Sequence, residues 1–132
     1  MTDTEADVKH HLYIWLKSFP FLQKKNLRRD FSDARLVAKL INYFMPKFAL
    51  ENAYPSCMSV AKKIDNWTRL NSKVLSQLGC QLSKENIEDL ANSKADATEE
   101  FLLQLASSLY KTNKHQIKIT IRQASNVALA TN

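Results

Sequence analysis

The chain has 132 residues, 45% of them apolar, and a formal net charge of +6. This length supports one domain, and a single glycine with three prolines favours long helices over tight turns, so we predict an all-α fold. No apolar run approaches the ~20 residues of a bilayer span, and the acidic start MTDTEADVK lacks a signal-peptide core, so we expect a soluble intracellular protein. Cys57 and Cys80 have no metal-ligand spacing, which indicates two reduced thiols in or near the core and no metal or other cofactor.

The positive charge is unevenly distributed along the chain. Residues 24–73 carry eleven lysines and arginines against four acidic residues, a local charge of +7, whereas residues 74–110 carry a charge of −4. Such polarisation favours an extended anionic partner. The alternative is a solvated, lysine-rich surface with no partner.

The first predicted helix begins at a capping box, in which the Thr4 hydroxyl accepts a first-turn N–H and the Asp7 carboxylate reaches back to the chain. We expect this helix to end near Phe19, because Pro20 disfavours helical geometry in the residue before it. Its apolar face is formed by Val8, Leu12, Trp15, Leu16 and Phe19.

The second predicted helix starts at Ser32 and Asp33 and stops around Pro46. Phe31 precedes it as an apolar anchor. Its apolar stripe consists of Leu36, Val37, Leu40, Ile41 and Phe44, with Arg35, Lys39 and Asn42 on the opposite face. Residues 46–58 are predicted to form a loop or short turns.

Five or six helices are predicted in all, and residues 59–111 are expected to form the remaining ones together with a bend. Ser59 caps a helix with Val60, Ile64 and Trp67 facing inward, and Asn71 marks a bend. The single glycine, Gly79, fits the left-handed residue that ends a helix. Ser83 and Thr98 then cap two more helices, whose inner faces are formed by Ile87, Leu90 and Ala91 and by Phe101, Leu102, Leu105 and Leu109.

The C-terminal residues 112–132 fit two patterns. Ile117, Ile119 and Ile121 alternate with polar residues as in a strand, whereas Ile117, Ile121, Ala124 and Ala128 fit a helix. A lone strand has no partner in a helical domain, so we predict a tail or linker after a domain of residues 4–111.

A basic cluster precedes the second helix. Lys24, Lys25, Arg28 and Arg29 fall within six positions, and packing does not explain so many charges. Arg29 could instead pair with a nearby aspartate, a contact that contributes about 0–1 kcal/mol when exposed.

Four segments follow one another in an order typical of one known family: LYIWLKSFPF (12–21), NLRRDFSDARLVAKLINYFMPK (26–47), YPSCMSVAKKIDNWTRLNSKVLSQLG (54–79) and FLLQLASSLY (101–110). Together they resemble the calponin-homology (CH) domain of the CLAMP or sperm-flagellar protein family over residues 8–111. The specific matches occur in the family's order: Trp15, the Arg-Asp-Phe-Ser-Asp run, Asn66-Trp67, and the series Leu70-Asn71 with Val74-Leu75. Ala34 departs from the pattern, because the family usually has glycine there.

The resemblance implies a compact helical domain that binds microtubules in cilia or flagella, within the cytoplasm and its cytoskeleton. CH domains that bind F-actin usually occur as tandem pairs, and this chain has room for one. We therefore predict that a basic patch docks on acidic tubulin. Its primary residues are Lys24, Lys25, Arg28 and Arg29, and its secondary residues are Lys62 and Lys63, with Lys47, Arg69 and Lys73 as weaker candidates. Arg29 is the strongest candidate, since it occupies the arginine position of the family motif and offers two donors to one carboxylate.

Other functions have less support. Actin binding or another protein interaction by a CH domain is the first alternative, and a basic helical reader of nucleic acid is the second, although no single helix carries base-reading side chains beside aromatics. No enzyme motif is present, and His10 and His11 are adjacent on a helix, so they do not share one metal face. We predict no nucleic-acid partner and no membrane partner, and any oligomerisation is expected to come from sequence outside this domain.

Overall fold

The computed structural model describes residues 4–23, 26–48, 50 and 52–112, and the described residues contain helices and no strand. This confirms the predicted all-α class. The elements are α1 (Glu5–Lys17), η1 (Pro20–Leu22), α2 (Leu27–Asp30), α3 (Arg35–Phe44), η2 (Pro46–Phe48), α4 (Val60–Leu70), η3 (Asn71–Leu75), α5 (Ser76–Leu78), α6 (Lys84–Ala91) and α7 (Ala95–Thr112). η1 and η2 are 3₁₀ turns, and η3 is a π-helical turn at the bend predicted near Asn71.

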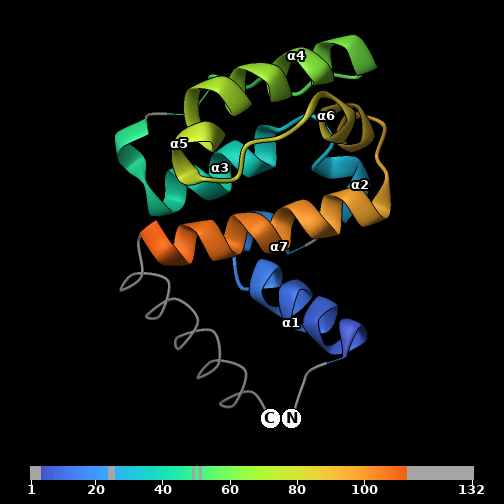
Figure 1. The fold of residues 1–132 in the computed structure, drawn as a ribbon, viewed down its shortest axis with the longest axis vertical. Coiled ribbons are helices and arrows are strands. Elements are labelled where there is room, and N and C mark those ends of the chain that lie inside the picture. The colour runs from blue at the N-terminus through green and yellow to red at the C-terminus, as the bar shows by residue number, and fades with distance from the viewer. Residues whose placement is uncertain (1–3, 24–25, 49, 51, 113–132) are drawn as a thin grey trace.

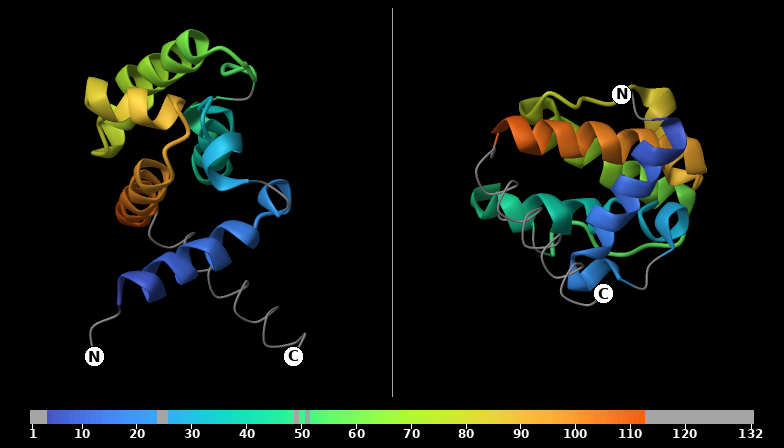
Figure 2. Two further views of the ribbon diagram at one scale, coloured as in Figure 1. Left: turned by 90° about the vertical axis from the view of Figure 1, so that its right-hand side faces the viewer. Right: turned by 90° about the horizontal axis from the view of Figure 1, so that it is seen from below.

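The long helix α7 crosses the middle of the molecule, with α4 and α6 on one side and α1 on the other (Figure 1). The left view of Figure 2 shows the same order, with α1 at the opposite end of the molecule from α4. α3 lies between α4 and α7 in Figure 1, and its wide apolar stripe is buried: Leu36, Val37, Ala38, Leu40, Ile41 and Phe44.

One hydrophobic core joins all the larger helices. Five of the residues expected to share that core are buried: Leu40, Ile41, Phe44, Trp67 and Leu105. Trp15 and Ile64, also expected there, are partly buried and pack against it. Trp67 Nε1 donates to the Ser32 carbonyl oxygen at 2.8 Å, whereas no acceptor in the described part of the chain reaches the buried Trp15 Nε1.

The predicted helix starts are mostly confirmed. Thr4 and Asp7 form the capping box, with the Asp7 N–H donating to Thr4 Oγ1 at 3.1 Å. Ser59 and Ser83 each accept a first-turn N–H at the starts of α4 and α6. Gly79 ends α5 with a φ of +76°, as predicted for a left-handed cap.

Three local predictions are wrong. The segment Leu27–Asp30, for which no helix is predicted, forms the separate short helix α2, capped by the Asn26 side chain. Thr98 is no cap, because α7 already begins at Ala95 and the buried Thr98 hydroxyl donates to the carbonyl oxygen of Lys94 at 3.0 Å. Val60 does not face inward, since its side chain is 40% exposed at the first turn of α4.

Ala34 adopts a left-handed backbone conformation, with a φ of +68°, while its side chain is fully buried. This conformation costs an alanine about 1–2 kcal/mol, which glycine avoids, and the buried methyl group contributes about 0.8 kcal/mol of burial. We therefore expect Ala34→Gly to leave the free energy of unfolding within about 1 kcal/mol of the wild type.

The matched control is Ala38→Gly, which removes an equally buried methyl group from the interior of α3. There glycine also loses about 1 kcal/mol of helix propensity, so the expected loss is about 2 kcal/mol. Thermal unfolding of the two variants followed by circular dichroism checks this difference. Equal destabilisation of both variants would contradict the strain assigned to Ala34.

Some predicted features lie outside the described residues: Lys24, Lys25 and the segment 113–132. The division into a domain of residues 4–111 and a tail stays a prediction. Across the described ranges, no helix combines the length and the apolar character needed to cross a membrane.

Candidate functional site

The start of α3 is tied to the segment before α4 by one buried carboxylate. Asp33 Oδ1 accepts the Arg35 N–H at 3.0 Å and so fixes the first turn of α3. Asp33 Oδ2 accepts from the Ser56 hydroxyl at 3.1 Å and from the Cys57 N–H at 3.4 Å. Two segments 23 residues apart in sequence are thereby held side by side.

The Asn66-Trp67 pair anchors α4 to the same place. Asn66 Nδ2 donates to the carbonyl oxygens of Asp33 and Pro55, both at 3.0 Å. Trp67 holds Ser32 through its indole N–H, and buried polar groups paired in this way resist local opening. The motif that carries the family resemblance is therefore the structural clamp of this region.

A groove of about 660 Å³ lies between α2, the start of α3, η1 and the segment before α4. The basic side chains that line it are Arg29, Arg35, Lys39 and Lys63. Its other principal lining residues are Phe21, Asp30, Asp33, Leu36, Ser56, Cys57 and Met58. Cations from α2, α3 and α4 thus converge on one concavity.

The accessible charge of this groove is positive. Arg29 is 75% exposed, while its partner Asp30, 3.4 Å away, is 26% exposed. Asp33 is 8% exposed, and both its oxygens already accept hydrogen bonds. Among the described residues, no carboxylate forms an ion pair with Arg35, Lys39 or Lys63. These three cations are available to an external anion.

The structure divides some of the predicted primary and secondary residues between two cavities. Arg29 and Lys63, from the primary and secondary sets, line the same groove. Arg28 lines a second cavity of about 420 Å³ between α1, α2 and the start of α7, together with Lys17. Lys62 is exposed on α4 and does not line the groove, while Lys24 and Lys25 lie outside the described residues.

Arg69, a weaker candidate for microtubule binding, makes several contacts with other residues of the domain. Its guanidinium donates to Asn66 Oδ1 at 2.6 Å and to the Ala53 carbonyl oxygen at 3.2 Å, and it lies 5.1 Å from the ring centroid of Tyr54. It also pairs with Asp65 at 3.1 Å. These contacts assign Arg69 to holding the loop before α4.

Four groove residues that could contact a ligand were not among the candidates from the sequence: Arg35, Lys39, Phe21 and Met58. Arg35 and Lys39 were expected on the exposed face of their helix. They are four residues apart and follow soon after Arg29, so the sequence could have indicated that their charges lie together on one helix face. Met58 had no such signal, because its exposure of 94% depends on the loop conformation.

The cysteine in the groove wall has an elevated pKa. Burial raises the pKa of the Cys57 thiol above its usual value, and the Asp33 carboxylate adds to this, while Lys63 and Lys62 oppose it. The thiol is therefore protonated at neutral pH and is a poor nucleophile. Cys80 is fully buried, and both cysteines are free, as predicted.

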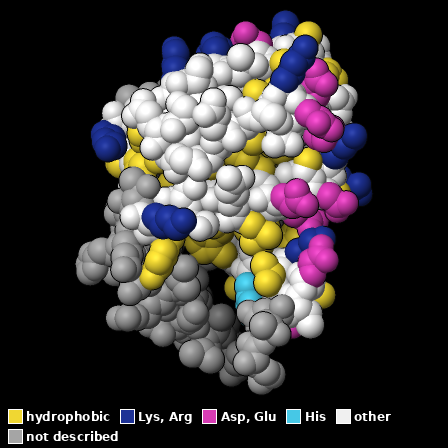
Figure 3. All heavy atoms as spheres, viewed as in Figure 1, with side chains coloured by type: hydrophobic (Ala, Val, Ile, Leu, Met, Phe, Trp, Pro, Cys, Tyr) yellow, Lys and Arg dark blue, Asp and Glu magenta, His cyan; other side chains and the backbone are white. Residues whose placement is uncertain are grey.

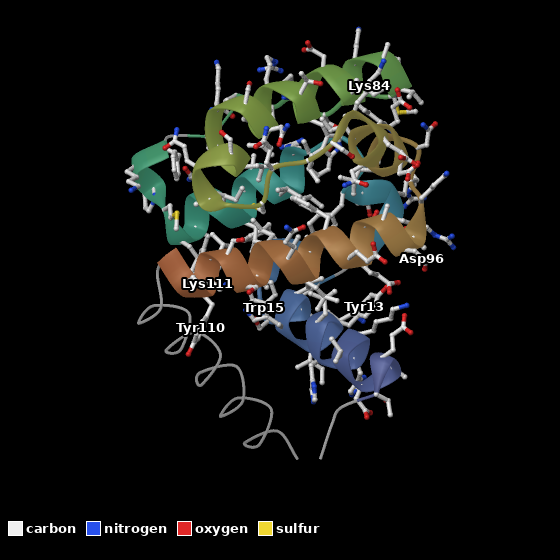
Figure 4. All side chains as sticks on the ribbon, viewed as in Figure 1. Tyr13, Trp15, Lys84, Asp96, Tyr110 and Lys111 are labelled. Carbon is white, nitrogen blue, oxygen red and sulfur yellow. The ribbon has the colours of Figure 1, made fainter. Side chains whose placement is uncertain are left out.

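Acidic side chains gather beside the second cavity, where Glu99 lines the wall together with Arg28 and Lys17. Acidic side chains cluster where α6 and the N-terminal end of α7 lie, whereas lysines and arginines project along α4 (Figure 3). Here Glu99 pairs with Lys9 at 3.2 Å and accepts from the Tyr13 hydroxyl at 3.3 Å, which fastens α1 to α7. Figure 4 shows Tyr13 and Trp15 pointing from α1 toward α7.

Within the described residues, no group of three or more histidine, cysteine, aspartate or glutamate side chains is arranged to hold a metal ion.

Comparisons with known proteins agree with this architecture. A family model described as "CH-like domain in sperm protein" matches residues 12–107. The chain is 32% identical over 116 residues to Sperm flagellar protein 1 of Mus musculus, covering 87% of this chain and 50% of that protein. It is 30% identical over 121 residues to the protein of the same name from Xenopus laevis, covering 90% and 53%. The chain thus spans about half the length of these curated relatives. It belongs to the calponin-homology domains of the CLAMP or sperm flagellar protein family.

Proposed function

We propose that this domain binds microtubules without enzymatic activity, by docking its basic groove and the surrounding cations on acidic tubulin. The observation that carries the proposal is the convergence of Arg29, Arg35, Lys39 and Lys63 on one concave surface. Charge complementarity of this kind steers association and fixes orientation. The relatives are named for the sperm flagellum, which supports a site of action on the cytoskeleton of a cilium or flagellum, including its axoneme.

The two cavities extend the proposed surface beyond the groove. Arg28 and Lys17 face the cavity beside α1, while Arg29 and Lys63 face the groove, so α2 presents cations on both of its sides. Lys62 adds an exposed charge on α4. A small electrostatic footprint of this kind gives modest affinity, and stronger attachment would come from oligomerisation through sequence outside the domain.

F-actin and nucleic acid are the competing partners. Actin binding is the alternative within the CH class, since the fold alone does not select the polymer. Duplex DNA is the other alternative, because a basic surface can also bind the phosphate backbone of nucleic acid. The cations here come from three helices and surround a groove instead of lining one helix that could enter a major groove, which favours a protein partner.

Parallel co-sedimentation of the 132-residue chain with microtubules, F-actin and duplex DNA in one buffer tests the proposal. We expect binding to microtubules to be at least about tenfold tighter than binding to the other two polymers, a difference typical of specific over nonspecific electrostatic contact. Affinity for F-actin or DNA equal to or above that for microtubules would assign the surface to another partner.

A further inference from the structure

We propose that the groove binds an extended acidic peptide segment of its partner, with one apolar side chain seated between Phe21 and Met58 while carboxylates pair with Arg35 and Lys39. This inference rests on the proposed function, because it names the part of the partner that the same site recognises. It makes the groove a peptide-binding site and not only a charged patch on a flat interface.

The shape of the site supports a protruding segment. A cavity of about 660 Å³ falls in the range of sites that enclose small ligands or a few side chains. A flat or convex protein surface would leave such a hollow unfilled, and unfilled hollows contribute little to affinity. A narrow segment of chain fills it.

The charges in the groove define the polar part of the ligand. Arg35 and Lys39 are spaced one helical turn apart on the exposed face of α3, so their cationic groups face the same space. Lys63 lies across the groove on α4, and none of the three has an ion-pair partner among the described residues. Carboxylates at neighbouring positions of an extended peptide match this distribution.

The apolar part of the ligand follows from two side chains at the rim. Met58 is 94% exposed, whereas Met45 in the core is 5% exposed. A flexible methionine beside a groove is well suited to close over an apolar group. Phe21, from η1, also lines the groove, with Lys39 Nζ 5.8 Å from its ring centroid, so an apolar and a cationic surface adjoin there.

The same composition disfavours a phosphate-rich ligand. The carboxylates of Asp30 and Asp33 also line the groove, and they would repel closely spaced phosphates more strongly than single carboxylates. An acidic peptide with one apolar residue keeps the density of negative charge lower and also offers an apolar group to Met58.

Fluorescence anisotropy with labelled heptapeptides tests this proposal on the 132-residue chain. The probe is a peptide of six glutamates around a central phenylalanine, and the comparison peptide has serine at the centre. We expect the phenylalanine peptide to bind about fivefold more tightly than the serine peptide, because part of the ring is buried. Arg35→Glu with Lys39→Glu should weaken both peptides by about tenfold or more.

Met58→Ala should reduce the preference for phenylalanine over serine to about twofold or less, because it removes one apolar wall. Val60→Ala is the matched control, since Val60 is also exposed at the start of α4 but does not line the groove, and it should leave the preference unchanged. Equal binding of the two peptides, no effect of Arg35 and Lys39, or tighter binding of an oligonucleotide of the same charge would each overturn the proposal.

Failure here is distinguishable from failure of the proposed function. If the peptides do not bind while co-sedimentation with microtubules still depends on Arg28 and Arg29, the inference falls and the proposed function stands. If the chain binds neither peptides nor microtubules, both fall. Thermal unfolding of each variant confirms that any loss of binding does not come from loss of the fold.

Discussion

Replacing Trp67 with alanine is expected to lower the free energy of unfolding by about 3–5 kcal/mol. The side chain is fully buried, and its ring meets the Phe101 ring edge to face, with centroids 5.2 Å apart. The substitution leaves a large cavity between α4 and α7 and also removes the donor to the Ser32 carbonyl oxygen. Chemical denaturation followed by circular dichroism measures the loss.

The variant Trp67→Phe separates the two contributions. It keeps most of the apolar volume but leaves the Ser32 carbonyl oxygen without its donor, so the expected loss is about 1–3 kcal/mol. An unchanged melting temperature for Trp67→Ala would contradict the role of this residue as the link between α4 and the groove wall.

Reversing the charges of Arg28 and Arg29 together is expected to abolish co-sedimentation with microtubules at moderate salt. Two attractive contacts become repulsive, which weakens binding by about tenfold or more. Of the single variants, Arg29→Glu should have the larger effect, because Arg29 lines the groove with Lys63 whereas Arg28 faces the cavity beside α1. Both side chains are exposed, so the melting temperature should change little.

The matched control is the double variant Lys84→Glu with Lys111→Glu, which changes the net charge by the same amount. Lys111 lies at the C-terminal end of α7 (Figure 4), roughly 24 Å along the helix from Ala95, beside which Arg28 lies. Lys84 is the first residue of α6, is exposed, and lines neither the groove nor the cavity beside α1. Microtubule binding that falls equally in both double variants would mean that only net charge matters.

The parts of the fold that were predictable depend on local chemistry. Ser59 and Ser83 cap helices because a hydroxyl can satisfy a free first-turn N–H, and Gly79 tolerates positive φ. The short helix α2 was missed because a helix of one turn has no periodicity to detect. Thr98 resembled a cap, yet packing carries α7 one turn further toward its N-terminus, and Ala34 adopts a conformation that its side chain disfavours.

The candidate site was predictable in its charge but not in its grouping. A run of basic residues identified Arg28 and Arg29, yet only the fold shows that they line separate cavities. The association of Arg29 with Lys63 depends on Asp33 and Asn66, which hold α4 against the start of α3 across more than twenty residues of sequence. Contacts of this range are set by tertiary packing and leave no pattern in a local window.

The most direct test of electrostatic docking is the salt dependence of microtubule binding, measured side by side for the wild type and the Arg28→Glu, Arg29→Glu variant. Raising the salt concentration from about 50 to 200 mM shortens the Debye length to below roughly 10 Å and screens exposed charge pairs. The account predicts a steep loss of wild-type affinity and a shallower response of the weak binding that remains in the variant, which still carries Arg35, Lys39 and Lys63. The same salt dependence in both proteins, or wild-type binding that does not respond to salt, would contradict it.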